Sequence, residues 1–142
     1  MSYGGKENKM TRGREKKSKV LIVDDTAVTL RNIKNILDRK YEVFLATSGQ
    51  QALKFIPEKE PDVMLLDHKM PGMSGADVLE TMRADENMKD IPVIFLTGAD
   101  DRKTIYSILN LKPAGYLLKP VDEAKLLETI QEVLASRKDK ED

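Results

Sequence analysis

Short apolar runs alternate with segments of helical periodicity along most of the chain. The apolar runs are rich in valine, isoleucine and leucine, and they predict five β-strands, at residues 20–23, 41–46, 63–66, 91–96 and 114–118. Between the strands, apolar residues recur every three or four positions, which predicts helices at 26–39, 48–57, 101–111 and 122–136. A further helix is expected to open at Ser74 and to carry Val78, Leu79 and Met82, and Pro57 is expected to end the second helix.

The predicted strands are continuously apolar rather than alternating between apolar and polar residues. Such strands are usually covered on both faces, and helical connections between successive strands imply a parallel sheet. We therefore predict an α/β fold in which a doubly wound, five-stranded parallel sheet lies between two layers of helices. The chain of 142 residues is long enough for one such domain, whereas a closed eight-fold barrel needs about 250 residues.

Polar residues directly follow four of the predicted strands: Asp24 and Asp25 the first, Asp67 the third, Thr97 the fourth and Lys119 the fifth. Because ligands of open parallel sheets bind at the carboxyl ends of the strands, we expect these side chains to converge at one edge. Each residue alone has a simpler interpretation, since an aspartate or threonine after a strand often caps a helix or a turn, and a lysine can pair with any surface acid. Their occurrence together favours a functional site.

The residue types at this edge suit phosphoryl transfer to a carboxylate. Clustered carboxylates repel one another and require a cation, and oxygen ligands without cysteine or histidine favour Mg²⁺, or Mn²⁺ in its place. Asp67, held on a rigid apolar stem, is the candidate nucleophile towards phosphorus, and its product would be an aspartyl-phosphate. Lys119 would neutralise charge on the transferring group, and the Thr97 hydroxyl would hydrogen-bond a phosphate oxygen. Gly72 and Gly75 would let the loop after Asp67 turn tightly.

Composition and charge narrow the class of protein further. The chain has no cysteine, which excludes disulfides and thiolate metal sites, and it has no apolar run that approaches the roughly 20 residues of a membrane span. Its first 19 residues hold seven lysines and arginines and two glutamates, although the net formal charge of the chain is zero. A basic tail of this kind can contact nucleic acid or a membrane, but we interpret residues 1–18 as a flexible leader. We expect a cytoplasmic protein whose body binds neither nucleic acid nor a membrane.

Four motifs in order resemble the receiver domain of two-component response regulators: VLIVDD, VMLLDHKMPGMSG, VIFLTG and GYLLKP. The resemblance covers residues 19–136 and leaves 137–142 as a charged tail or a truncated linker. It implies a flavodoxin-like fold with strand order 2-1-3-4-5 and five helices. It also implies a signalling phosphoacceptor rather than an enzyme, with autocatalytic phosphotransfer and autodephosphorylation only. The implied phosphoryl donor is a phosphohistidine on a sensor histidine kinase or on a histidine phosphotransfer protein.

The resemblance assigns roles to the acidic residues and their neighbours. It makes Asp67 the phosphoacceptor and a metal ligand, Asp25 a direct ligand of Mg²⁺, and Asp24 a residue that acts mainly through water. Lys69 would supply its main-chain carbonyl to the metal, and its side chain stands at a position that tunes dephosphorylation in the family. We expect His68, the only histidine of the chain, to be an inert side chain at the rim.

Three residues near the other strand ends form the implied switch. Thr97 is the switch hydroxyl, Lys119 is the phosphate-binding lysine, and Tyr116 occupies the position of the switch aromatic. The peptide bond between Lys119 and Pro120 is expected to be cis. The placement of Thr97 and Tyr116 predicts that the signal leaves through the surface formed by the fourth helix, the fifth strand and the fifth helix, and a homodimer would use the same surface.

Two other functions use some of the same residues. A Mg²⁺-dependent phosphohydrolase would also form an aspartyl-phosphate, but such a nucleophile usually has a second aspartate two residues later, where this chain has Lys69. A receiver-like scaffold would bind partners without phosphorylation, and the complete set of acids, threonine and lysine argues against it. The resemblance places Ala99 at the second position that tunes phosphate lifetime in the family.

Overall fold

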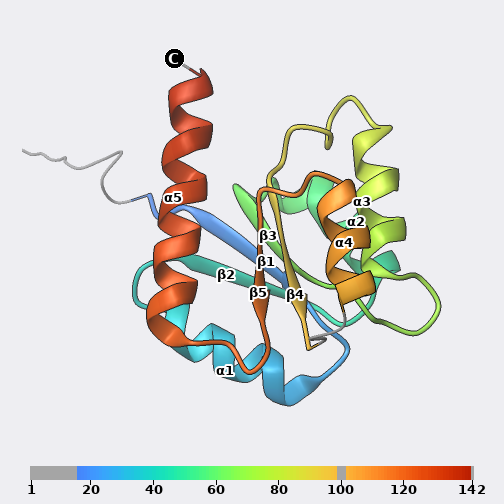
Figure 1. The fold of residues 1–142 in the computed structure, drawn as a ribbon. Helices are drawn as coiled ribbons and strands as arrows, with labels where there is room; N and C mark the ends of the chain where they lie inside the picture. Colours follow the sequence, from blue (N-terminus) through green and yellow to red (C-terminus); the bar gives the residue numbers. More distant parts are fainter. Residues whose placement is uncertain (1–15, 99–101, 142) are drawn as a thin grey trace, which may run out of the picture.

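A computed structural model describes residues 16–98 and 102–141, and it shows a parallel sheet between two layers of helices (Figure 1). The strands are hydrogen-bonded in the order β2-β1-β3-β4-β5, and all neighbours are parallel. The predicted α/β sandwich and its strand order are therefore confirmed. Most of the predicted basic leader, together with Ala99, lies outside the described residues. The strands are β1 Lys19–Val23, β2 Glu42–Ala46, β3 Val63–Asp67, β4 Val93–Thr97 and β5 Gly115–Leu118.

The helices cover the sheet on both faces (Figure 1). α1 (Ala27–Leu37) and α5 (Glu123–Glu141) pack over one apolar core, which includes Ile22 and Leu65. The opposite core includes Leu21 and Met64, and it is covered by α2 (Gly49–Lys59), α3 (Gly75–Arg83) and α4 (Arg102–Asn110). Successive residues of a strand point to opposite faces, so every residue of β3 and β4 is buried. This explains why those strands are continuously apolar rather than alternating.

Serine caps start two of the helices where the sequence predicted them. The Ser48 hydroxyl accepts a hydrogen bond from the Gln51 backbone N–H at 3.1 Å, at the start of α2. At the start of α3, Ser74 accepts from the Asp77 N–H at 3.2 Å, and the Asp77 carboxylate accepts from the Ser74 N–H at 3.1 Å. This reciprocal capping box satisfies two backbone donors that a helix leaves unpaired at its first turn.

Two predicted helix ends are wrong. Pro57 does not end α2, because it lies inside the helix, which continues to Lys59 and closes at Glu60 in the left-handed conformation with φ of 50°. The Glu60 N–H bonds to the Ile56 carbonyl, so the last turn is completed beyond the proline. α5 extends to Glu141 rather than ending at Ser136. The other predicted element ends agree with the structure to within two residues, and the largest of these differences are at the end of α1 and the start of β4.

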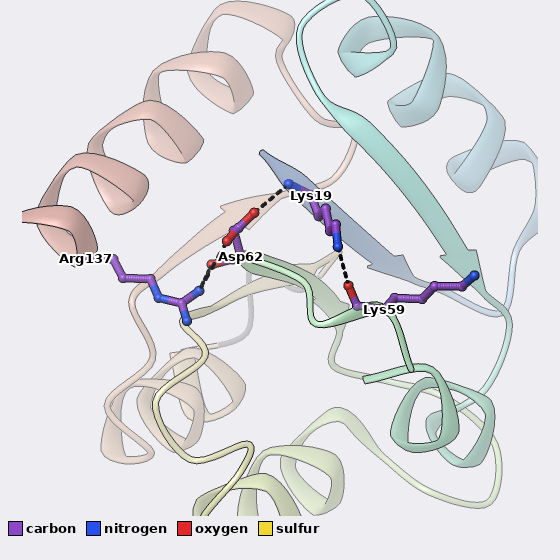
Figure 2. A network of polar contacts seen from close by, with 4 residues as sticks. All are labelled: Lys19, Lys59, Asp62 and Arg137. Carbon is purple, nitrogen blue, oxygen red and sulfur yellow. Dashed lines mark hydrogen bonds and ion pairs between the residues drawn. The ribbon is translucent and has the colours of Figure 1, made fainter. Parts of the chain in front are cut away.

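A network of polar contacts fixes α5 at the amino-terminal ends of the strands, as Figure 2 shows. The Arg137 guanidinium donates to the Asp62 carbonyl at 2.7 Å and lies 3.9 Å from the Asp62 carboxylate. That carboxylate accepts from the Lys19 N–H at 2.7 Å, and the Lys19 ammonium donates to the Lys59 carbonyl at 3.1 Å. The network therefore joins α5 to the start of β1 and to the end of α2. Within the described part of the chain, the helices are too short or too polar to cross a membrane.

Candidate functional site

Three carboxylates meet at the carboxyl edge of the sheet, because adjacent parallel strands end there in register. Val23 of β1 pairs with Leu66 of β3, so the next residues along the two chains, Asp24 and Asp67, lie beside one another. One carboxylate oxygen from each of Asp24, Asp25 and Asp67 lies within 4.8 Å of the others. Asp24 and Asp67 are buried, whereas Asp25 is exposed. The predicted acidic cluster is therefore present, with one of its three members open to solvent.

Asp24 is held on both of its oxygens by the protein. Its Oδ1 accepts a hydrogen bond from the Thr26 N–H at 2.8 Å, and its Oδ2 lies 2.7 Å from the Lys119 ammonium. The second contact is an ion pair between a buried oxygen and a partly buried ammonium. A fully buried carboxylate is costly unless it is paired, so Lys119 is the group that makes the burial of Asp24 tolerable.

Asp67 ends β3 with its side chain at the rim of the sheet. Its Oδ1 lies 3.2 Å from the Lys119 ammonium, which thus bridges Asp67 and Asp24. Burial and the negative charge of Asp24 raise the pKa of Asp67 to about 6, although the Lys119 ammonium opposes that rise. Since a pKa near 6 is well above the usual value for an aspartate, the site without a cation holds more negative charge than it can easily accommodate.

Lys119 enters the site from the end of β5. Its backbone N–H donates to the Thr97 carbonyl at 2.8 Å, and the peptide bond between Lys119 and Pro120 is cis, as the resemblance implied. Burial alone would lower the pKa of this ammonium, but the carboxylates of Asp24 and Asp67 outweigh burial and raise it. The lysine therefore carries a full positive charge at neutral pH, and it is positioned beside both buried acids.

The residues predicted to form the switch lie on and directly after the last two strands. Thr97 is the buried last residue of β4, where it pairs in register with Leu118. Tyr116 lies on β5 opposite Phe95 and is 38% exposed, so its ring is partly in solvent. Thr97 and Lys119 share a backbone hydrogen bond, which couples the ends of β4 and β5 directly.

Lys69 and His68 follow Asp67 but differ in exposure. The Lys69 side chain is exposed, and His68 is half-buried with its ring edge-on to Phe95 at 5.9 Å between centroids. Burial, and then the charge of Lys69, lower the pKa of His68, so the ring is neutral at pH 7. Its buried Nδ1 has no hydrogen-bond partner. The predicted role of Lys69 concerns its main-chain carbonyl and remains a proposal.

The two glycines after Asp67 act differently from each other. Gly72 has a φ of 77°, which favours glycine, as expected for a tight turn. The backbone conformation of Gly75 does not require glycine, but the space around it does. A Cβ there would lie 2.5 Å from the Asp67 carbonyl oxygen and 3.0 Å from the His68 Cα. Its N–H donates to the His68 carbonyl at 2.9 Å. The start of α3 is therefore docked directly on the backbone that presents the Asp67 carboxylate, a contact that the sequence analysis missed.

Replacing Gly75 by alanine should destabilise the protein by about 2–3 kcal/mol, because the added methyl group meets backbone that has no room to move. Urea denaturation would measure the loss. Gly98→Ala is the matched control, since a Cβ at Gly98 meets no heavy atom within 4 Å, and its effect should stay within about 0.5 kcal/mol. Equal losses in the two variants would contradict the proposed close contact.

The donor atoms at this edge fit a hard divalent cation. The acids offer three oxygen ligands within 4.8 Å of one another, with no cysteine or histidine among them. Mg²⁺ prefers such oxygens and usually retains several waters. Asp25 and Asp67 have oxygens available for direct ligation, whereas both oxygens of Asp24 contact the protein. Direct ligation by two acids, with Asp24 acting through water, fits these contacts.

Comparison with known proteins agrees with this geometry. Residues 20–131 match the family described as "Response regulator receiver domain". The chain is 35% identical over 120 residues to chemotaxis protein CheY-3 of Vibrio cholerae, covering 83% of this chain and 92% of that protein. It is 36% identical to a nitrate/nitrite response regulator protein homolog of Haemophilus influenzae, covering 82% of this chain but only 57% of that relative.

A solved structure has the same arrangement of strands and helices. Chemotaxis protein CheY4 of Vibrio cholerae superposes with a TM-score of 0.76 at 30% identity, covering 82% of this chain and 98% of that one. The family match extends from the first residues of β1 well into α5, so it includes every strand that contributes to the acidic edge. On this evidence the chain belongs to the response regulator receiver domain family.

Proposed function

We propose that this protein accepts a phosphoryl group on Asp67 from a phosphohistidine of a sensor histidine kinase or a histidine phosphotransfer protein. The observation that carries the proposal is the position of Asp67, whose carboxylate lies between a cluster of acids and the Lys119 ammonium. A buried carboxylate is a useful nucleophile towards phosphorus only if cationic groups neutralise the charge that the phosphoryl group brings. Lys119 provides one such charge.

The reaction is a displacement at phosphorus. An oxygen of the Asp67 carboxylate forms the new bond to phosphorus, the bond from phosphorus to the donor imidazole nitrogen breaks, and the imidazole leaves with that electron pair. A bound Mg²⁺ would neutralise charge on the phosphoryl oxygens. With a pKa of about 6, Asp67 is mostly ionised at pH 7, so the nucleophile needs no separate base.

The residues around Asp67 divide the remaining tasks. Asp25 and the Lys69 carbonyl would hold the cation with Asp67, and Asp24 would act through water while fixing Lys119. When the phosphoryl group arrives, Lys119 would remain ion-paired with Asp24 and contact a phosphoryl oxygen in place of the Asp67 carboxylate. The signal ends when water hydrolyses the acyl phosphate, so each cycle restores free Asp67 and releases inorganic phosphate.

Magnesium should stabilise the wild-type protein. Adding about 10 mM Mg²⁺ should raise the melting temperature by on the order of 3–5 °C if the dissociation constant is near 1 mM, because the cation relieves repulsion among the three acids. Asp25→Ala should lose most of this gain. Asp90→Ala, which removes an exposed acid just before β4, should keep it. No shift in the wild type, or an undiminished shift in Asp25→Ala, would rule out a cation site here.

We further propose that the surface of α4, β5 and α5 transmits the signal to a partner or to a second copy of the chain. Four large apolar side chains are exposed on α4 and β5, which supports a surface that another protein covers. Thr97 lies at the phosphoacceptor end of β4, next to β5. Movement of its hydroxyl towards the phosphoryl group would reach Tyr116 across the β4–β5 pairing. The exposed side chains are Tyr106 at 73%, Leu109 at 49%, Tyr116 at 38% and Leu118 at 50%.

A beryllofluoride mimic of the phosphoryl group should shift the amide NMR signals of α4 and β5 in the wild type. In Thr97→Ala these shifts should shrink several-fold, because the hydroxyl that links Asp67 to β5 is missing, while shifts in the loop after Asp67 persist. Thr81→Ala is a control that removes a hydroxyl bonded only within α3, to the Asp77 carbonyl, and it should respond as the wild type does. Shifts confined to the Asp67 loop in the wild type would show that another surface carries the output.

A further inference from the structure

α4 is weakly embedded in the protein for its length. Within α4, all of which the structure describes, one side chain is buried, that of Ile108. α3 has the same length of nine residues and buries three side chains, those of Val78, Leu79 and Met82. An element with little buried apolar surface opens or shifts at low cost in free energy. The position of α4 must therefore depend on contacts other than core packing.

Arg83 supplies such a contact at the C-terminal end of α4. Its guanidinium, at the last residue of α3, donates to the Leu111 carbonyl at 3.2 Å and to the Lys112 carbonyl at 2.9 Å. These two carbonyls lie in the turn directly after α4, which ends at Asn110, and a charged guanidinium makes stronger hydrogen bonds to them than a neutral donor would. Lys112 itself has a φ of 54°, which turns the chain away after α4.

The space beneath this contact is open rather than packed. A cleft of about 490 Å³ lies between α3 and α4, and Leu79, Glu80, Arg83, Asn110 and Leu111 are among the residues that line it. The Arg83 side chain therefore crosses between the two helices along an open cleft. Because the cleft is open, loss of the guanidinium would leave the Leu111 and Lys112 carbonyls to water.

We propose that Arg83 is a pivot for α4: it holds the C-terminal end of the helix against α3, so that phosphorylation displaces mainly the N-terminal end. This inference rests on the proposed function, because the displacing event is phosphorylation of Asp67. The N-terminal end of α4 is the end closer along the chain to Thr97, and the end held by Arg83 is the one that leads into β5. Such a pivot converts a change at Thr97 into a tilt of the surface that carries Tyr106 and Leu109.

The anchoring is tested first without any phosphoryl mimic. In Arg83→Ala, backbone amides at Tyr106–Lys112 should exchange with deuterium about tenfold faster than in the wild type, because the bonds to the Leu111 and Lys112 carbonyls are lost. Arg83→Lys can reach one carbonyl at a time, so its exchange should be intermediate. Arg39→Ala, which removes an exposed arginine just beyond α1, should match the wild type. Unchanged exchange in Arg83→Ala would overturn the proposal.

The pivot is tested next with Mg²⁺ and beryllofluoride. In the wild type, amide NMR shifts should be at least about threefold larger at Arg102–Ile105 than at Ile108–Lys112, and in Arg83→Ala they should become comparable at both ends. Equal shifts at both ends in the wild type would overturn the pivot. If beryllofluoride changes nothing in any variant, the proposed phosphorylation fails and the pivot with it, while faster exchange in Arg83→Ala would still establish the anchor.

Discussion

Asp67→Asn should abolish the incorporation of phosphate from acetyl phosphate and Mg²⁺, whereas the wild type should take up one phosphate that is stable to acid and labile to base. Phosphoryl transfer to this position requires an ionised oxygen nucleophile, and the amide of an asparagine has none. The loss should be complete, because Asp24 is held on both oxygens by Thr26 and Lys119, and Asp25 stands in solvent rather than against the lysine. Intact-protein mass spectrometry at neutral pH would count the phosphates.

The matched control for this experiment is Asp90→Asn. It makes the same chemical change at an exposed acid outside the cluster, so its phosphorylation should equal that of the wild type. Retention of the added phosphate in Asp67→Asn would place the acceptor elsewhere and would make Asp67 a metal ligand only. Loss in both variants would mean that the change perturbs the protein generally.

Lys119→Met should destabilise the metal-free protein by about 2–4 kcal/mol at pH 7.5. The side chain of Asp24 is fully buried and that of Asp67 is 6% exposed, so removal of the ammonium leaves two buried carboxylates without a counter-charge. The lysine itself is 24% exposed, which keeps the expected loss below that of a fully buried pair. Urea denaturation in the presence of a chelator would measure it, and Mg²⁺ should restore part of the stability. Lys125→Met, an exposed lysine on α5, should change the stability by less than about 0.5 kcal/mol.

The loss in Lys119→Met should be smaller at pH 5 than at pH 7.5. An acid whose pKa is higher in the folded state contributes stability at low pH that is lost as the pH rises through the folded value. The pKa of Asp67 is about 6 with Lys119 present, and it rises further when the ammonium that opposes this shift is removed. At pH 5 the carboxyl group of the variant is therefore largely protonated and needs no partner. Equal losses at both pH values would show that the lysine stabilises the fold by packing alone.

The fold was predictable from the sequence because its strongest signals are local. Buried strands such as β3 carry apolar side chains on both faces, and the capping box of Ser74 and Asp77 marks the start of α3 within four residues. The errors occur where local rules compete with the rest of the structure. A proline usually breaks a helix. At Pro57, however, α2 continues, because Ile56 is buried and its carbonyl accepts a hydrogen bond from the Glu60 N–H. Arg137 belongs to α5 because its partner is Asp62, which is distant in sequence.

The members of the site were predictable, whereas their pairing was not. The position of Asp67, Thr97 and Lys119 after successive strands follows from the rule that parallel strands end at a common edge. Nothing in the sequence indicates that Lys119 lies closer to Asp24 than to Asp67, or that Asp24 is the acid with both oxygens engaged. The close approach of Gly75 to the Asp67 backbone was likewise not predicted, although the glycine directly after the serine cap is a signal for it.

The fixation of α5 by Arg137 has a use in protein engineering. α5 is one continuous helix from Glu123 to Glu141, and the contact of Arg137 with Asp62 ties its last part to the sheet. A fluorescent reporter joined through an uninterrupted helix would therefore inherit a defined orientation relative to the domain. Each residue inserted at such a junction would rotate the reporter by about 100° and advance it by about 1.5 Å, so a short series of insertions would sample every direction around the helix axis.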